Sequence, residues 1–170
     1  FISNGSLIGR IIPAFPVPNG VLVLFIVAGV VSWILSRTVL GRYAFALGSN
    51  EEAVRLSGVD TGRWKMAIYA LSGGIVGIAG LLISSRLNSA QPALGLGYEL
   101  EAIAAVVIGG TSLSGGRGTV LGTVIGALIM SVLTNGLRVL SVAPEWQTVV
   151  TGAIIIVAVY ADQLRRGRAG

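Results

Sequence analysis

A glycine-rich decapeptide, GGTSLSGGRG at residues 109–118, is the stretch whose residue types most suggest a binding loop. A phosphate-binding loop would need the pattern G-x-x-x-x-G-K-[ST], in which a lysine reaches the phosphates. The only lysine of this chain is Lys65, far from the decapeptide in the sequence. The pattern therefore argues against a nucleotide site here. It leaves three hydroxyl groups as candidates for lining a substrate pathway, those of Thr111, Ser112 and Ser114.

Composition excludes several other chemistries. The chain contains no histidine and no cysteine. These absences remove His-based acid–base catalysis, thiol nucleophiles, disulfides and the usual zinc sites. We therefore expect no catalytic residue and no metal site in this chain.

Two carboxylates, Glu99 and Glu101, stand at the start of a short apolar segment, residues 99–110. Ionisable groups near a membrane interior are functional candidates by default. At the N-terminus of a helix they also interact favourably with the helix dipole, and we favour a structural or docking role for them. The polar residues expected on the outer, periplasmic side of the membrane are Arg86, Asn88, Gln91, Glu99 and Glu101.

The composition of the chain indicates a membrane protein. Of its 170 residues, 54% are hydrophobic and 11% are charged, whereas about 25% of the residues of a soluble domain are charged. A spanning helix needs about 20 mostly apolar residues. The segment 99–110 is too short, at roughly 18 Å, and the glycine-rich turn follows it. The apolar segments are 17–35, 64–85, 99–110, 119–138 and 146–160.

These segments predict an all-α fold, a polytopic helical membrane protein with about four spanning helices and one short, broken or half-spanning helix. Non-helical backbone at membrane depth persists only where protein or a water-filled cavity satisfies it. The broken helix is therefore the element expected to line a pathway. Glycines at a spacing of four, as in Gly118, Gly122 and Gly126, favour close helix packing within the bundle.

Basic residues predict the orientation, because positively charged loops stay in the cytoplasm. With the segment 36–63 and the tail inside, only Arg10, Arg86 and Arg138 lie outside. The nine inside are Arg37, Arg42, Arg55, Arg63, Lys65, Arg117, Arg165, Arg166 and Arg168.

Within the cytoplasmic segment, SNEEAVRLSG predicts a short helix. Ser49 with Glu52 matches a capping box, Asn50 is an equally good cap, and Gly58 fits the C-terminal stop. So short a helix needs a partner surface to be stable. That partner is either the protein's own bundle or a cytoplasmic subunit, and the sequence physics leaves both open.

Three long motifs carry a resemblance to a known family. GRYAFALGSNEEAVRLSGVDTGRWKM, GYELEAIAAVVIGGTSLSGGRGTVLGTVIGAL and WQTVVTGAIIIVAVYADQLRRGR occur in this order. They resemble the permease subunits of bacterial ABC sugar importers of the ribose, xylose and galactose type, over most of the chain. Residues 1–170 would be the C-terminal half of the transmembrane permease domain, with 36–63 as its coupling loop. Since the chain begins with Phe1, we expect it to be incomplete as a working unit.

The resemblance implies ATP-driven import of a monosaccharide by alternating access. From the broken helix itself, Thr111, Ser112 and Ser114 either offer hydroxyls to the sugar or satisfy the carbonyls of that helix. The chain would lie in the bacterial plasma membrane and bind no cofactor and no nucleic acid, with ATP held by a partner ATPase. Other partners would be a second permease subunit, making a homodimer, and a periplasmic sugar-binding protein. The coupling helix that docks on the ATPase would comprise Asn50, Glu51, Glu52, Ala53, Arg55, Leu56 and Gly58.

Alternative functions remain at this point. The same machinery could carry branched-chain amino acids or nucleosides. A secondary transporter without an ATPase would place carboxylates at mid-bilayer for ion coupling, whereas the acidic residues here cluster in loops and at segment ends.

Overall fold

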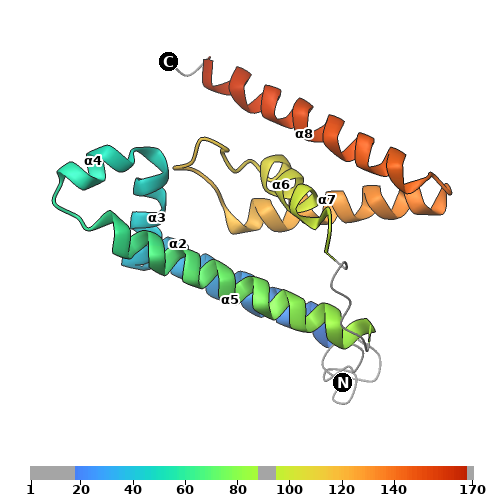
Figure 1. The fold of residues 1–170 in the computed structure, drawn as a ribbon, viewed down its shortest axis with the longest axis horizontal. Coiled ribbons are helices and arrows are strands. Elements are labelled where there is room, and N and C mark those ends of the chain that lie inside the picture. The colour runs from blue at the N-terminus through green and yellow to red at the C-terminus, as the bar shows by residue number, and fades with distance from the viewer. Residues whose placement is uncertain (1–17, 88–94, 168–170) are drawn as a thin grey trace. The chain divides into compact units, whose positions relative to one another are not determined.

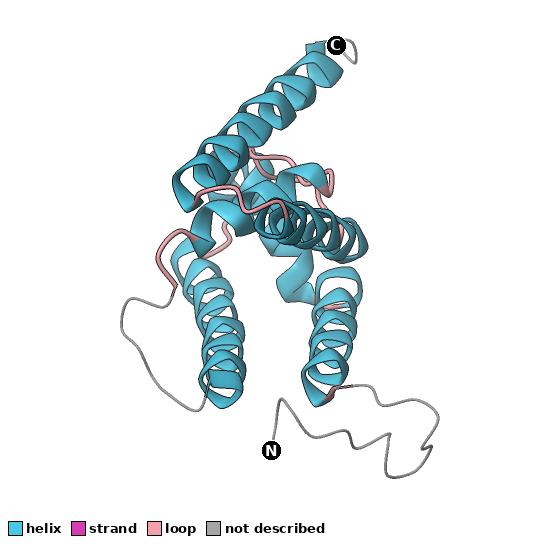
Figure 2. Ribbon diagram, turned by 90° about the vertical axis from the view of Figure 1, so that its right-hand side faces the viewer, coloured by secondary structure: helices cyan, strands magenta, loops and turns pink. Residues whose placement is uncertain are grey.

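A computed structural model describes residues 18–87 and 95–167. In those two ranges the chain folds into helices joined by turns, without a β-strand (Figures 1 and 2). The expected all-α class is confirmed. The helices are α2 (Asn19–Arg37), α3 (Val39–Ser49), α4 (Glu51–Leu56), α5 (Thr61–Leu87), α6 (Tyr98–Ile108), α7 (Val120–Val139) and α8 (Pro144–Gly167).

Three of the described helices, α2, α5 and α7, are long and apolar enough to cross a membrane. They lie at the segments expected at 17–35, 64–85 and 119–138. The segment expected at 146–160 falls within α8, whose apolar part, Pro144–Tyr160, is below the length of a full span. Helix α6 has 11 residues and lies at the short segment expected at 99–110.

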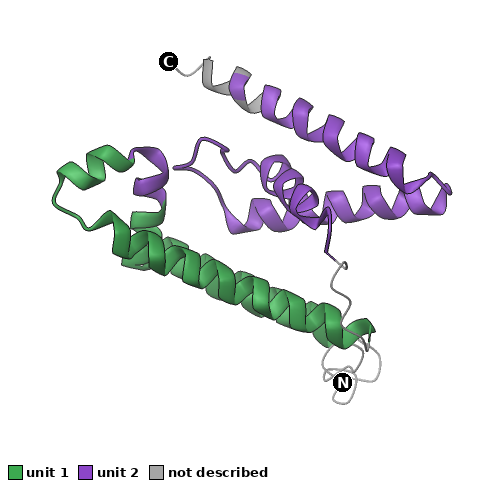
Figure 3. Cartoon of the chain, in the orientation of Figure 1, with its two compact units in different colours: residues 1–44, 51–94 green, residues 45–50, 95–170 purple. Residues whose placement is uncertain are grey.

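The chain divides into two compact units (Figure 3). One comprises residues 1–44 and 51–94, and the other comprises residues 45–50 and 95–170. The boundary falls inside α3, so the last turn of that helix belongs with the second unit.

In the first unit, the chain reverses sharply between α2 and α3. Thr38 is extended, and its hydroxyl accepts the backbone N–H of Gly41 at 3.4 Å, as an N-cap does. A Cβ on Gly41 would overlap the backbone of Leu35, so only glycine fits this approach. The sequence predicted a loop here with one short helix, and α3 is therefore an additional element.

Helices α2 and α5 of the same unit line one apolar cavity of about 430 Å³. The side chains of Val30, Ile34, Leu71 and Ile75 are among those that line it. Neither helix has a buried apolar side chain among the described residues. The two helices therefore leave apolar surface between them, which a lipid environment tolerates.

The second unit has a small core of Ala104, Ala105 and Met130, with Ile154 and Ile155 of α8 packed against it. Helix α6 crosses α7 at glycines. A Cβ on Gly126 would overlap the carbonyl oxygen of Ala105 and lie 2.9 Å from its carbonyl carbon. Gly122 likewise abuts the carbonyl of Gly109. The prediction that this glycine series packs within the bundle is confirmed for α7.

Candidate functional site

The first candidate site is the short helix α4, which begins at Glu51, two residues after α3 ends at Ser49. Asn50 is therefore the residue that separates the two helices, and Ser49 belongs to α3. Glu51 and Glu52 lie in the first turn of α4, where the helix dipole favours carboxylates. Gly58 has φ +80° and its N–H donates to the carbonyl of Arg55 at 3.0 Å. Both ends are thus set by local sequence.

Helix α4 presents a small exposed surface. The Leu56 side chain is 79% exposed, Ala53 is exposed and Val54 is half-buried. Arg55 pairs with Glu52 at 2.6 Å, with both side chains more than half exposed. Such surface pairs contribute about 0–1 kcal/mol. The helix therefore offers apolar contact area within a charged rim.

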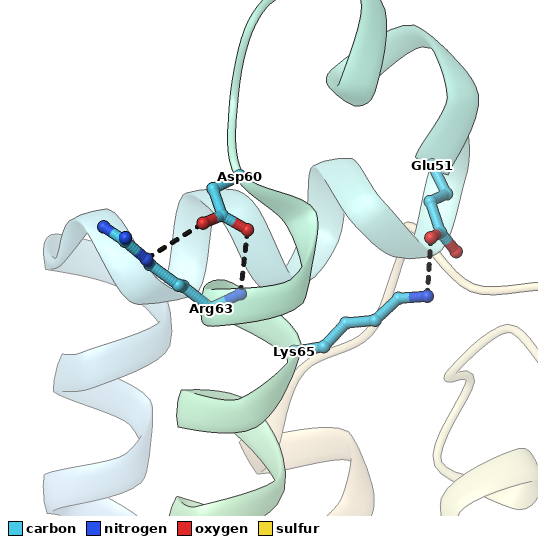
Figure 4. Close-up of polar contacts among 4 residues, drawn as sticks. All are labelled: Glu51, Asp60, Arg63 and Lys65. Carbon is cyan, nitrogen blue, oxygen red and sulfur yellow. Dashed lines mark hydrogen bonds and ion pairs between the residues drawn. The ribbon is translucent and has the colours of Figure 1, made fainter.

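The start of α5 holds α4 in place (Figure 4). Lys65 Nζ lies 2.6 Å from Glu51 Oε1. Of the two ion pairs drawn, this one joins residues farther apart in the sequence. Asp60 accepts the backbone N–H of Arg63 at 3.2 Å and pairs with its Nε at 2.9 Å, so Asp60 caps α5. A displacement of α4 would therefore act directly on the first turn of a candidate span.

An aromatic contact joins the same region. The rings of Tyr43 in α3 and Trp64 in α5 lie 4.5 Å apart between centroids, at an interplanar angle of 38°. Aromatic pairs at this separation add about 0.5–1.5 kcal/mol beyond their area burial. Neither this pair nor the Glu51–Lys65 pair could be predicted from the sequence, because both depend on how the segments fold back.

The second candidate site is the turn that follows α6. Its backbone closes on itself, since Ser112 N–H donates to the carbonyl of Arg117 at 3.0 Å and Gly115 N–H donates to that of Ser112 at 3.1 Å. Thr111 N–H donates to the carbonyl of Val106 at 3.1 Å. Thr111 is half-buried, Ser112 is buried and Ser114 is exposed. The three hydroxyls predicted to line a pathway thus differ in environment.

The turn rests on the last turn of α3 through backbone atoms. A Cβ on Gly115 would overlap the carbonyl oxygen of Gly48 and lie 2.8 Å from its carbonyl carbon. A Cβ on Gly116 would lie 2.9 Å from the Cβ of Ser49. Because α4 starts two residues after Ser49, this contact connects the turn to the first candidate site through the chain.

Ser112 allows a direct test of what its hydroxyl does. Its Oγ is buried and lacks a hydrogen-bond partner within the described part of the chain. An unsatisfied buried hydroxyl costs about 1–3 kcal/mol, so Ser112→Ala should raise the thermal midpoint of the purified protein. Ser114→Ala, at an exposed position, should leave it unchanged. A Ser112→Ala midpoint below that of the parent would contradict this account of the hydroxyl.

The polar residues predicted for the outer face fall in different settings. Arg86 is exposed in the last turn of α5, and Glu99 Oε2 accepts the N–H of Gly97 at 3.1 Å at the start of α6. Glu101 instead lines a cavity. Asn88 and Gln91 lie outside the described residues. The two carboxylates that looked equivalent in sequence therefore have different surroundings.

Comparison with known proteins gives consistent matches. One family, described as "Branched-chain amino acid transport system / permease component", matches residues 2–159. The chain is 47% identical over 161 residues to the ribose import permease protein of Haemophilus influenzae, over 95% of this chain and 48% of that protein. It is 50% identical over 149 residues to the ribose import permease protein of Bacillus subtilis, over 87% of this chain and 45% of that protein.

A third relative has a different named sugar. The chain is 46% identical over 153 residues to the xylose transport system permease protein of Escherichia coli, over 90% of this chain and 38% of that protein. The chain thus spans about half the length, or less, of these curated relatives. No solved structure matches the chain.

Proposed function

This chain belongs to the family of branched-chain amino acid transport system permease components, and from that membership we propose that it forms part of the membrane-spanning subunit of an ATP-driven importer. The importer moves a monosaccharide, a pentose such as ribose or xylose, into the cell by alternating access. It lies in the bacterial plasma membrane.

The substrate class is supported by the relatives and not by the family's name. Ribose and xylose permeases are 45–50% identical to this chain, whereas the family description mentions branched-chain amino acids. A pentose is therefore the first candidate, and branched-chain amino acids and nucleosides are the alternatives. The described candidate spans α2, α5 and α7 contain no Asp or Glu, which favours an ATP-driven over an ion-coupled transporter.

The observation that carries the proposal is the exposure of α4 together with its connection to α5. Leu56 and Ala53 form an apolar surface on a six-residue helix, too short to be stable in water without a partner. A cytoplasmic ATPase subunit that binds this surface would move the first turn of α5 through Asp60 and the Glu51–Lys65 pair. The docking residues are Asn50, Glu51, Glu52, Ala53, Arg55, Leu56 and Gly58.

In this arrangement the chain does no covalent chemistry and binds no cofactor. ATP is hydrolysed on the partner subunit, and a periplasmic binding protein delivers the sugar. A second permease subunit, an identical copy, completes the pathway. Thr111, Ser112 and Ser114 remain candidates for that pathway, at the turn where α6 ends.

Cysteine cross-linking tests the docking of α4. The 170 residues contain no cysteine, so Leu56→Cys introduces a single thiol into this part of the assembled importer. We expect it to cross-link to the ATPase subunit, and Leu140→Cys, with a side chain 75% exposed at the end of α7, to form no such product. Labelling of Leu56→Cys by an impermeant thiol reagent added outside intact cells would contradict both the docking and the orientation.

Uptake measurements test the transport cycle itself. Vesicles that contain the importer and its ATPase, with the periplasmic binding protein outside, should accumulate labelled ribose or xylose when ATP is inside. Leucine should not compete. Accumulation that follows a proton gradient in the absence of ATP would favour the secondary transporter instead.

A further inference from the structure

A cavity of about 230 Å³ lies where the N-terminal ends of α6 and α8 meet the C-terminal part of α7. The three helices are otherwise largely apolar, yet each contributes polar side chains to this cavity. Glycine-rich backbone before α6 completes the wall. The polar side chains that line it are Glu101, Thr134, Arg138, Gln147, Thr148 and Thr151.

Side chains of α8 can accept hydrogen bonds from a ligand in the cavity. The Thr148 and Thr151 hydroxyls donate to the carbonyls of Pro144 and Gln147, at 3.2 and 3.0 Å. Each hydroxyl oxygen can still accept hydrogen bonds. Gln147 Nε2 donates to the carbonyl of Val142 at 2.8 Å, which leaves its amide oxygen as an acceptor. Thr151 is only 7% exposed and Gln147 is half-buried, whereas Thr148 is exposed, so the α8 wall of the cavity runs from buried to solvent-facing groups.

Glu101 and Arg138 add opposite charges. Among the residues that the structure describes, neither carries an ion pair, although both line the same cavity. Glu101 is half-buried and Arg138 is exposed, so both side chains remain available to a ligand. A carboxylate accepts several hydrogen bonds and a guanidinium donates up to five. The pair of charges thus offers both donors and acceptors with no net charge.

This set of groups identifies a class of ligand. A cavity without net charge gives no preference for an anion or a cation, whereas hydroxyl groups act as both donor and acceptor and match the polar side chains on its wall. Tyr98 adds an aromatic ring beside them. The volume lies below the roughly 300–1,000 Å³ of pockets for drug-sized ligands, so the ligand is small.

We propose that the cavity between α6, α7 and α8 binds a monosaccharide through its hydroxyl groups, with Glu101 accepting and Arg138 donating hydrogen bonds. This inference rests on the proposed function, since it assigns the transported sugar to one site in the chain. The proposed sugar-binding residues are Glu101, Thr134, Arg138, Gln147 and Thr151. The sequence had instead indicated the hydroxyls of the glycine-rich turn.

Sugar protection of a cysteine tests the site. In the assembled importer, Thr134→Cys should react with a water-soluble thiol reagent, and saturating D-ribose or D-xylose should slow that reaction at least threefold. Leu140→Cys, at the C-cap of α7 and outside the cavity, should react at the same rate with or without sugar. An unchanged rate at Thr134→Cys, in vesicles that still take up ribose, would overturn the site while leaving the proposed function intact.

Sugar affinity gives a second readout. Glu101→Gln should raise the KM for sugar uptake roughly tenfold with little change in maximal rate, since a charge-assisted hydrogen bond becomes a weaker neutral one. Glu145→Gln, also in a first helical turn but outside the cavity, should leave KM unchanged. Equal KM values in the two variants would overturn the role of Glu101. Protection of Thr134→Cys by sugar-free binding protein, and not by sugar, would identify a protein-docking site instead.

Discussion

Replacing Gly126 with alanine should destabilise the protein, although alanine is the better helix former. The added Cβ would overlap the carbonyl oxygen of Ala105 and lie 2.9 Å from the backbone nitrogen of Gly109. Both are backbone atoms of the α6 segment, so no side chain can rotate away. Overpacking of this kind costs about 1–3 kcal/mol. We expect a thermal midpoint several degrees lower for the purified importer.

Gly136→Ala is the matched control, because it lies on the same helix and nothing lies within 4 Å of its added Cβ. It removes the helix penalty of glycine and should be neutral or stabilising by roughly 0.5–1 kcal/mol. The two substitutions are chemically identical and should act in opposite directions. A Gly126→Ala protein as stable as Gly136→Ala would show that α6 and α7 do not cross at this glycine.

Replacing Gly115 with alanine should have the other large effect, and it should appear in transport. Gly115 has φ +84°, which costs an L-residue about 1–2 kcal/mol, and its Cβ would also overlap the carbonyl oxygen of Gly48. The turn after α6 would have to move away from α3. Given the proposed coupling through α4, sugar uptake should fall roughly tenfold or more, a barrier change above 1.4 kcal/mol.

Gly110→Ala separates the two causes. Gly110 lies in the same turn with φ +83°, and nothing lies within 4 Å of its added Cβ. It should carry the backbone strain alone and retain most of the uptake. Cross-linking through Leu56→Cys, measured in both variants, shows whether the ATPase still docks. If both variants lose uptake equally, the contact with Gly48 has no role of its own.

Local signals in the sequence predicted the elements well. The acidic first turn and Gly58 bracket α4, and apolar length separates α2, α5 and α7 from the short α6. Helix α3 was missed because the charged and glycine-containing segment after Ser36 looked like a loop. Thr38 was an available N-cap signal, three residues before the N–H that it accepts.

The sites depended on tertiary contacts that no spacing reveals. Glu99 and Glu101 are two residues apart, yet one hydrogen-bonds the backbone before its own helix and the other lines a cavity. For Arg138 the sequence predicted only a position on the outer side of the membrane. Its proximity to Glu101 follows from the crossing of α6 and α7 at glycines, which brings positions from distant parts of the chain together.

The contact between Gly48 and Gly115 has a mechanical consequence. Backbone atoms meet there without intervening side chains, so the joint contains no rotamer that could absorb a small movement. Close-packed protein of this kind is barely compressible and transmits strain. A shift of a few tenths of an ångström at the end of α3 would therefore displace the turn by nearly the same distance.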